Sequence, residues 1–162
     1  MKQPTKTNAA RVLDRAGVAY RIRTYTLPED AEFSAVAVAE AVGVEPERLF
    51  KTLIVEGEQT GHLFALIPAN TELNLRALAS ASGNKRVALA ALRDVLALTG
   101  YLRGAVTPLA AKTAYPVFID ETIELWPEVG LSAGMRGLQV LLAPEDLIRV
   151  TQARLADIAS QA

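Results

Sequence analysis

The chain of 162 residues contains no cysteine and only one histidine, His62. Without cysteine there are no disulfides, no thiolate metal ligands and no thiol nucleophile supplied by the protein. A single imidazole also excludes most zinc sites and most Ser-His or Cys-His dyads, because these need a histidine at a second, specific position. We therefore expect no metal and no other cofactor, and any thiol chemistry would have to come from a substrate.

A strong charge of one sign and long apolar runs are also missing. With 17 basic and 18 acidic residues the net charge is −1, so a nucleic-acid partner would need a local basic patch. No segment approaches the roughly 20 apolar residues of a membrane span, and the N-terminal residues contain no apolar stretch like that of a signal peptide. These features predict a cytoplasmic protein without a membrane partner.

The composition that is present favours a folded core. Hydrophobic residues make up 51% of the chain, which is enough to bury the interior of one compact domain over residues 1–162. Apolar spacing, capping residues and turn residues predict helices at 7–16, 34–42, 75–81, 90–98 and from Pro144, and strands at 20–25, 49–56, 62–68, 116–120, 123–126 and 138–142. Because these elements alternate irregularly and include a hairpin, we expect an α/β fold with a mixed sheet.

Lys51 interrupts an apolar strand. Alternation along residues 49–56 places Lys51 on one face with Leu49, Leu53 and Val55, and both faces of this strand are largely apolar. A lysine in this position either extends to the margin of the sheet or holds its ammonium group in a pocket with anionic partners. The strand pattern alone leaves both interpretations open.

Two glycine-containing segments could approach a ligand closely. The loop from Leu98 to Pro108 contains Gly100 and Gly104, and glycine N–H groups are suitable donors to a developing oxyanion, although an ordinary turn has the same composition. The second segment contains Ser132 and Gly134, whose hydroxyl and backbone amide could bind a substrate, with Arg136 nearby for a phosphate.

Residues 130–134 also match the G-x-S-x-G pattern of a nucleophile elbow around Ser132. That motif requires a histidine downstream of the serine, whereas His62 lies far upstream. We therefore interpret the match as accidental. His62 follows Gly61 at a turn and is interpreted as structural.

Taken together, three separated motifs resemble the YbaK family of aminoacyl-tRNA editing domains. These are Phe50-Lys51-Thr52-Leu53, the segment from Thr99 through Gly104 to Thr107-Pro108, and Ser132 through Gly137-Leu138. The likeness covers nearly the whole chain. It implies a YbaK-like α/β fold with a mixed, partly barrel-like central sheet, and a hydrolase that removes an amino acid from misacylated tRNA(Pro).

The resemblance also implies a set of site residues. Lys51 and Gly104 correspond to catalytic positions, and the substrate-binding positions correspond to Tyr25, Thr107, Ser132, Gly134 and Arg136. In the family the cysteinyl thiol of Cys-tRNA(Pro) attacks its own ester, so the protein needs no nucleophile, metal or cofactor. Prolyl-tRNA synthetase is the protein partner that the family suggests.

The last motif departs from the family pattern S-G-G-K-R-G-L-D. This chain has Ala133, Met135 and Gln139 in place of a glycine, a lysine and an acid. Two alternatives to Cys-tRNA(Pro) deacylation therefore stay open: a deacylase for another amino acid, such as Ala-tRNA(Pro), and a noncatalytic regulator that binds tRNA or a protein partner. A third, a serine hydrolase using Ser132, predicts turnover of generic activated esters.

Overall fold

The computed structural model describes residues 6–29 and 33–161. The helices are α1 (Asn8–Arg15), α2 (Ala35–Val42), α3 (Leu75–Ser82), α4 (Val95–Thr99) and α5 (Pro144–Thr151), with 3₁₀ helices η1 (Pro46–Arg48), η2 (Leu92–Asp94) and η3 (Glu121–Leu125). The strands are β1 (Tyr20–Thr24), β2 (Phe50–Gly57), β3 (Gly61–Pro68), β4 (Thr71–Leu73), β5 (Val87–Leu89), β6 (Val117–Asp120), β7 (Val129–Ser132), β8 (Leu138–Leu142), β9 (Arg154–Ala156) and β10 (Ala159–Gln161).

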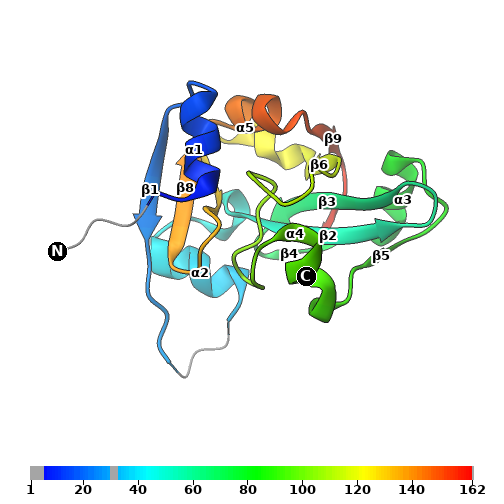
Figure 1. Cartoon of the computed structure of the whole chain (residues 1–162), viewed down its shortest axis with the longest axis horizontal. Coiled ribbons are helices and arrows are strands. Elements are labelled where there is room, and N and C mark those ends of the chain that lie inside the picture. Colours follow the sequence, from blue (N-terminus) through cyan, green and yellow to red (C-terminus); the bar gives the residue numbers. More distant parts are fainter. Residues whose placement is uncertain (1–5, 30–32, 162) are drawn as a thin grey trace.

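The strands form three sheets, with the orders β1-β8-β7, β5-β2-β3-β6-β9 and β10-β4. The five-stranded sheet is mixed, because β2 and β3 form an antiparallel hairpin whereas β3, β6 and β9 run parallel. The mixed α/β fold predicted from the sequence is thus confirmed, and no sheet of the described residues closes into a barrel. Figure 1 shows β1 and β8 at one end of the molecule and the hairpin β2–β3 extending toward α3 and β5 at the other.

The predicted helix caps of the first half are confirmed. The side chains of Thr7, Ser34 and Asn74 accept hydrogen bonds from backbone N–H groups three residues later, at 3.2, 3.0 and 3.0 Å. Such bonds satisfy donors that the first turn of a helix leaves without a partner. Gly43 ends α2 in the left-handed conformation, with φ of 79°.

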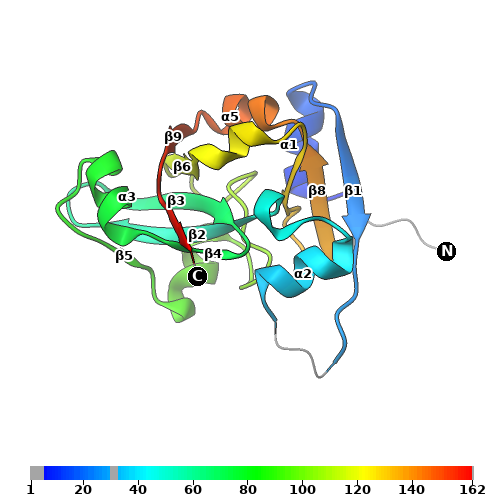
Figure 2. The ribbon, with the colours of Figure 1, turned by 180° about the vertical axis from the view of Figure 1, so that it is seen from behind.

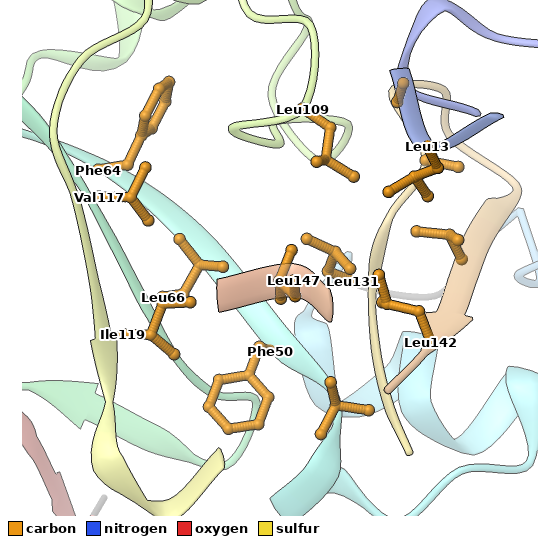
Figure 3. Packing of buried hydrophobic residues seen from close by; sticks show 14 of the residues in the cluster. Leu13, Phe50, Phe64, Leu66, Leu109, Val117, Ile119, Leu131, Leu142 and Leu147 are labelled. Carbon is orange, nitrogen blue, oxygen red and sulfur yellow. The ribbon is translucent and has the colours of Figure 1, made fainter. Parts of the chain in front are cut away.

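The main core lies between the three-stranded and five-stranded sheets. Phe50, Phe64 and Leu66 come from the hairpin, whereas Leu131 and Leu142 come from β7 and β8, and each is at most 2% exposed. Figure 3 shows these side chains in one cluster, together with Leu13 of α1 and Leu147 of α5. Seen from behind in Figure 2, α2 lies beside β1 and β8, and a second cluster there joins Val38, Ala39 and Leu141.

Two element predictions need correction. Residues 123–126 do not form a strand, because the Asp120 side chain accepts a hydrogen bond from Thr122 N at 3.2 Å and starts η3 instead. The helix predicted over 90–98 is divided into η2 and α4, although it ends at Gly100 as expected.

Asp120 also anchors the last strands, since its other carboxylate oxygen accepts hydrogen bonds from Ile158 N and Ala159 N at 3.0 Å each.

Among the described residues, no helix is long and apolar enough to cross a membrane.

Candidate functional site

A cleft of about 410 Å³ lies along one edge of β2. This strand pairs with β3 over its whole length, but on the other edge only Val55–Gly57 has a strand partner, β5. From Lys51 to Leu53 no strand of the described residues covers that edge. Five parts of the chain form the cleft walls. They are residues 33–35 and 38 at the start of α2, Leu49 and residues 50–54 of β2, residues 89, 90, 92 and 95 from β5 to α4, residues 103, 104 and 106 of the following loop, and Ser132 and Gln139 from β7 and β8.

Lys51 lines this cleft and is half-buried. Its Nζ donates a hydrogen bond to the carbonyl oxygen of Ala69 at 3.3 Å. Burial lowers the pKa of the Lys51 ammonium below its usual range, and the charge of Glu72 opposes that shift. Among the described residues, the ammonium group makes this one long hydrogen bond, so it keeps donors for an anionic ligand.

Gly104 lines the same cleft from the loop after α4, next to the ring of Phe33. Its φ is 88°, a conformation that side chains other than glycine rarely adopt. A Cβ at this position would also lie 2.6 Å from Cζ of Phe33 and 3.1 Å from Nε of Arg136. Residue 104 therefore has to be glycine, both for the backbone conformation and for the close approach of Phe33.

Several side chains hold the loop around Gly104, which follows α4, in place. Tyr101 donates its hydroxyl to Leu109 O at 2.5 Å, and burial raises the pKa of that phenol. Arg136 donates through Nε to Arg103 O at 2.8 Å, while its guanidinium carbon lies 5.0 Å from the centre of the Phe33 ring. These contacts fix the backbone on both sides of Gly104, so a ligand would meet a preformed loop.

Ser132 connects this loop to the three-stranded sheet. Its hydroxyl donates to Ala105 O at 2.8 Å and accepts from Gly134 N at 3.1 Å. Ser132 ends β7 and leads through a turn into β8, so the strand-to-helix geometry of a nucleophile elbow is absent here. The serine is positioned to order the loop, and its hydroxyl makes no hydrogen bond to a basic side chain in the described part of the chain.

The other predicted site residues lie around the cleft and not on its walls. Tyr25 packs against α2, and Thr107 is fully buried, where its Oγ1 accepts from Leu109 N at 3.3 Å. Gly134 lies next to the Tyr101 ring and Arg136 next to Phe33. The structure therefore brings Lys51, Gly104 and Ser132 together on one cleft, with Tyr25, Thr107, Gly134 and Arg136 outside its lining.

Two lining residues that the sequence analysis did not assign to the site carry buried acceptors without partners. Within the described residues, Thr52 Oγ1 and Gln139 Oε1 make no hydrogen bond, and Gln139 is only 4% exposed. A buried polar atom left in this state costs about 1–3 kcal/mol, which a ligand could recover. The signal for Gln139 was available, because it is the single polar residue in the apolar run Leu138–Leu142. Phe33, which has no polar side-chain atom, also lines the cleft without having been predicted, and nothing in its sequence neighbourhood indicates its role.

The described lining carries positive charge. It contains Lys51 and Arg103, and none of its described members is a carboxylate. This arrangement suits an anionic ligand, such as a phosphodiester, and a developing oxyanion. His62 lies outside the cleft, at the start of β3, with its ring 5.6 Å from that of Tyr115. Over residues 6–29 and 33–161, histidines and carboxylates form no cluster that could hold a metal ion.

Comparison with known proteins identifies the family. The model of the aminoacyl-tRNA editing domain matches residues 29–150, which include every residue of the cleft lining. The chain belongs to the YbaK family of aminoacyl-tRNA editing domains. It is accordingly a hydrolase of the aminoacyl-tRNA deacylase type, which acts on the ester bond between an amino acid and tRNA.

Curated relatives in this family carry related names. The chain is 41% identical over 160 residues to "Putative Cys-tRNA(Pro)/Cys-tRNA(Cys) deacylase EbsC" of Enterococcus faecalis, with 99% of this chain and 97% of that protein covered. It is 28% identical over 150 residues to "Multifunctional Ser/Thr-tRNA deacylase ProXp-y" of Escherichia coli, with 90% and 87% covered.

Solved structures show the same fold. The crystal structure of "a putative trans-editing enzyme for prolyl tRNA synthetase" superposes with a TM-score of 0.83 at 26% identity, over 99% of each chain. That of "hypothetical protein APE2540" gives a TM-score of 0.85 at 25% identity, over 95% of this chain and 100% of the other.

Proposed function

We propose that this editing deacylase acts on misacylated tRNA(Pro), with Cys-tRNA(Pro) as its main substrate. The observation that carries the proposal is the position of Lys51 and Gly104 on two walls of one cleft. The name of the EbsC relative, which is 41% identical, supports cysteine as the amino acid removed. The absence of cysteine from this chain is consistent with a thiol that comes from the substrate.

In the proposed reaction, the thiol sulfur of the cysteinyl group attacks the carbonyl carbon of its own ester. A C–S bond forms, the C–O bond to the ribose breaks, and the thiol proton passes to the departing ribose oxygen. Water then opens the cyclic thioester to give free cysteine. Because the nucleophile is already part of the substrate, the protein has to orient it and stabilise charge, and orientation alone can lower a barrier by several kcal/mol.

Lys51 and Gly104 take separate roles in this scheme. The Gly104 N–H donates to the ester carbonyl oxygen as it gains negative charge, in a loop that needs no rearrangement. The Lys51 ammonium binds a phosphate of the tRNA 3′ end or the developing anion, since its half-buried position strengthens such a pair relative to one in water. Ser132 and Arg136 support this site by holding the loop through Ala105 O and Arg103 O.

Prolyl-tRNA synthetase is the proposed protein partner. The net charge of −1 gives tRNA little long-range attraction, so a synthetase that already holds the tRNA would raise the local concentration of substrate. The structural neighbour described as a trans-editing enzyme for that synthetase supports this choice.

A second candidate is a deacylase for amino acids without a thiol, such as alanine, with a water molecule as the nucleophile. The ProXp-y relative, named as a Ser/Thr-tRNA deacylase, favours this possibility. Hydrolysis of Cys-tRNA(Pro), Ala-tRNA(Pro) and Ser-tRNA(Pro), measured with and without the synthetase, separates the candidates. We expect cysteine to be released fastest; equal rates for alanine would exclude the thiol-assisted mechanism, and tRNA binding without any hydrolysis would indicate a noncatalytic regulator.

A further inference from the structure

Gln139 lines the cleft, and its amide oxygen is a buried hydrogen-bond acceptor without a partner among the described residues. All five residues of β8 are buried, and Gln139 is the polar one among them. Its Cα partner across the sheet is Ser132, so both side chains emerge on the same face. The Ser132 hydroxyl already donates its proton to Ala105 O and therefore has none left for Gln139 Oε1. The amide oxygen of Gln139 is thus left for a ligand.

Thr52 supplies a second neutral group to the same cleft. It lies on the part of β2 whose edge has no strand partner among the described residues, and its buried Oγ1 also lacks a partner there. Two residues of the cleft lining, which also includes Gly104, therefore carry an uncharged hydroxyl and an uncharged amide oxygen without hydrogen-bond partners among the described residues. Together they can accept hydrogen bonds from an N–H group of a ligand.

The charged groups near this pair are cations. Lys51 and Arg103 line the cleft, and Arg136 lies beside Gly104. Arg23 of β1 is the other Cα partner of Gln139, and its guanidinium donates to Val42 O at 3.0 Å. Glu72 of β4 affects the pKa of Lys51 but does not line the cleft. A protonated amine placed beside Gln139 would meet like charges and no described carboxylate on the cleft walls.

Ser132 also places Gln139 close to the position expected for the reacting ester. It bonds to Ala105, the neighbour of Gly104, and pairs with Gln139 in the sheet. In an aminoacyl ester the α-nitrogen is attached to the carbon next to the carbonyl. An ester carbonyl bound by Gly104 N–H therefore keeps its α-nitrogen in the same cleft that Ser132 and Gln139 line.

We propose that Thr52 and Gln139 bind the α-nitrogen of the aminoacyl group in an uncharged form, so that the cleft accepts N-acylated aminoacyl esters as well as free amines. This inference rests on the proposed deacylase function of the same site. An ammonium group has to lose its proton before it binds, whereas an N-formyl amide keeps one N–H donor and carries no charge at any pH.

The proposal gives a defined pH dependence. A free α-amine has a pKa of about 7.7–8.0, so only about 2% of it is neutral at pH 6. The affinity for a free-amine ligand should therefore rise roughly 50- to 90-fold between pH 6 and pH 9, whereas an N-formyl ligand lacks this dependence. A change in the charge of Lys51 with pH would alter the affinities for both ligands by the same factor. It therefore does not change the ratio of their Kd values.

The test uses non-hydrolysable 3′-amide analogues of cysteinyl-adenosine, with a free or an N-formylated α-nitrogen, in calorimetric titrations from pH 6 to pH 9. We expect the N-formyl analogue to bind at least about tenfold more tightly at pH 6 and the two affinities to converge by pH 9. Tighter binding of the free amine at pH 6 would overturn the proposal. If the expected Kd ratio is found while neither corresponding ester is hydrolysed, the subsite is supported and the deacylase function is refuted.

Two variants and one control show which residues bind the α-nitrogen. Gln139→Glu replaces the amide by a carboxylate of the same shape and should reverse the preference at pH 6 in favour of the ammonium form. Gln59→Glu is the matched control, because Gln59 lies at the tip of the β2–β3 hairpin and its Oε1 only accepts from Lys85 N. A Gln139→Glu protein that keeps the wild-type ratio would show that the α-nitrogen binds elsewhere. Thr52→Val should weaken both analogues by a similar factor, and unchanged affinity would remove Thr52 from the subsite.

Discussion

The ring of Phe33 lies so close to Gly104 that a Cβ on residue 104 would come within 2.6 Å of its Cζ. Gly104→Ala should therefore displace the ring or turn the backbone N–H away from the cleft. Since loss of one donor to an oxyanion lowers turnover by about 10²-fold, we expect a fall of that order in the kcat for deacylation. Gly61→Ala is the control, because it has a similar φ of 79° but open space around it. Equal losses in both variants would show that backbone strain, and not the site, is responsible.

A different result is expected for Ser132, because both hydrogen bonds of its hydroxyl are made to backbone groups of the protein. Ser132→Ala removes the bond to Ala105 O and leaves Gly134 N without its acceptor, so the free energy of unfolding should fall by about 1–3 kcal/mol. We expect a moderate decrease in kcat through a less ordered Gly104 loop. Rapid-quench experiments on the wild type should detect no acyl-enzyme, and a burst that disappears in Ser132→Ala would instead identify a serine nucleophile.

The half-buried Lys51 makes stability depend on pH. Burial lowers its pKa in the folded state, with Glu72 opposing, so the unfolded chain binds more protons between the folded value and the usual 10.5. The wild type therefore gains stability as pH rises through that window. Lys51→Met should be more stable than the wild type at pH 7, and this difference should narrow toward pH 10 in urea denaturation. A difference that widens with pH would contradict the assigned direction of the pKa shift.

Much of the fold could be predicted because its signals are local. Capping side chains at Thr7, Ser34 and Asn74 and the stop at Gly43 determine helix ends within a few residues. The alternation around Lys51 predicted two faces, and Phe50 and Leu53 do pack into different clusters.

The elements that the sequence did not predict depend on distant partners. Strands β4, β5, β9 and β10 are only three residues long and exist because another segment lies beside them. The apolar run 123–126 is not a strand, because Leu125 is 76% exposed and Ile123 is the buried residue of η3. Apolar composition without alternation does not distinguish these two outcomes.

Part of the candidate site could also be predicted from the sequence. Lys51 was noticeable as a charge in an apolar strand, whereas Gly104, in a loop with the composition of an ordinary turn, was assigned to the site through the resemblance to the YbaK family. Phe33, in contrast, reaches the cleft only through tertiary packing against Gly104 and Arg136. Gln139 was noted as a departure from the family pattern, but its unpartnered oxygen depends on how Ser132 is bonded.

The central claim is that Lys51 enables deacylation of Cys-tRNA(Pro), and it is tested most directly by single-turnover hydrolysis of that substrate by Lys51→Ala. Lys85→Ala serves as the control, because Lys85 is exposed and does not line the cleft. We predict a fall in the hydrolysis rate on the order of 10²-fold for Lys51→Ala and no change for Lys85→Ala. Hydrolysis by a folded Lys51→Ala protein at the wild-type rate would contradict the account.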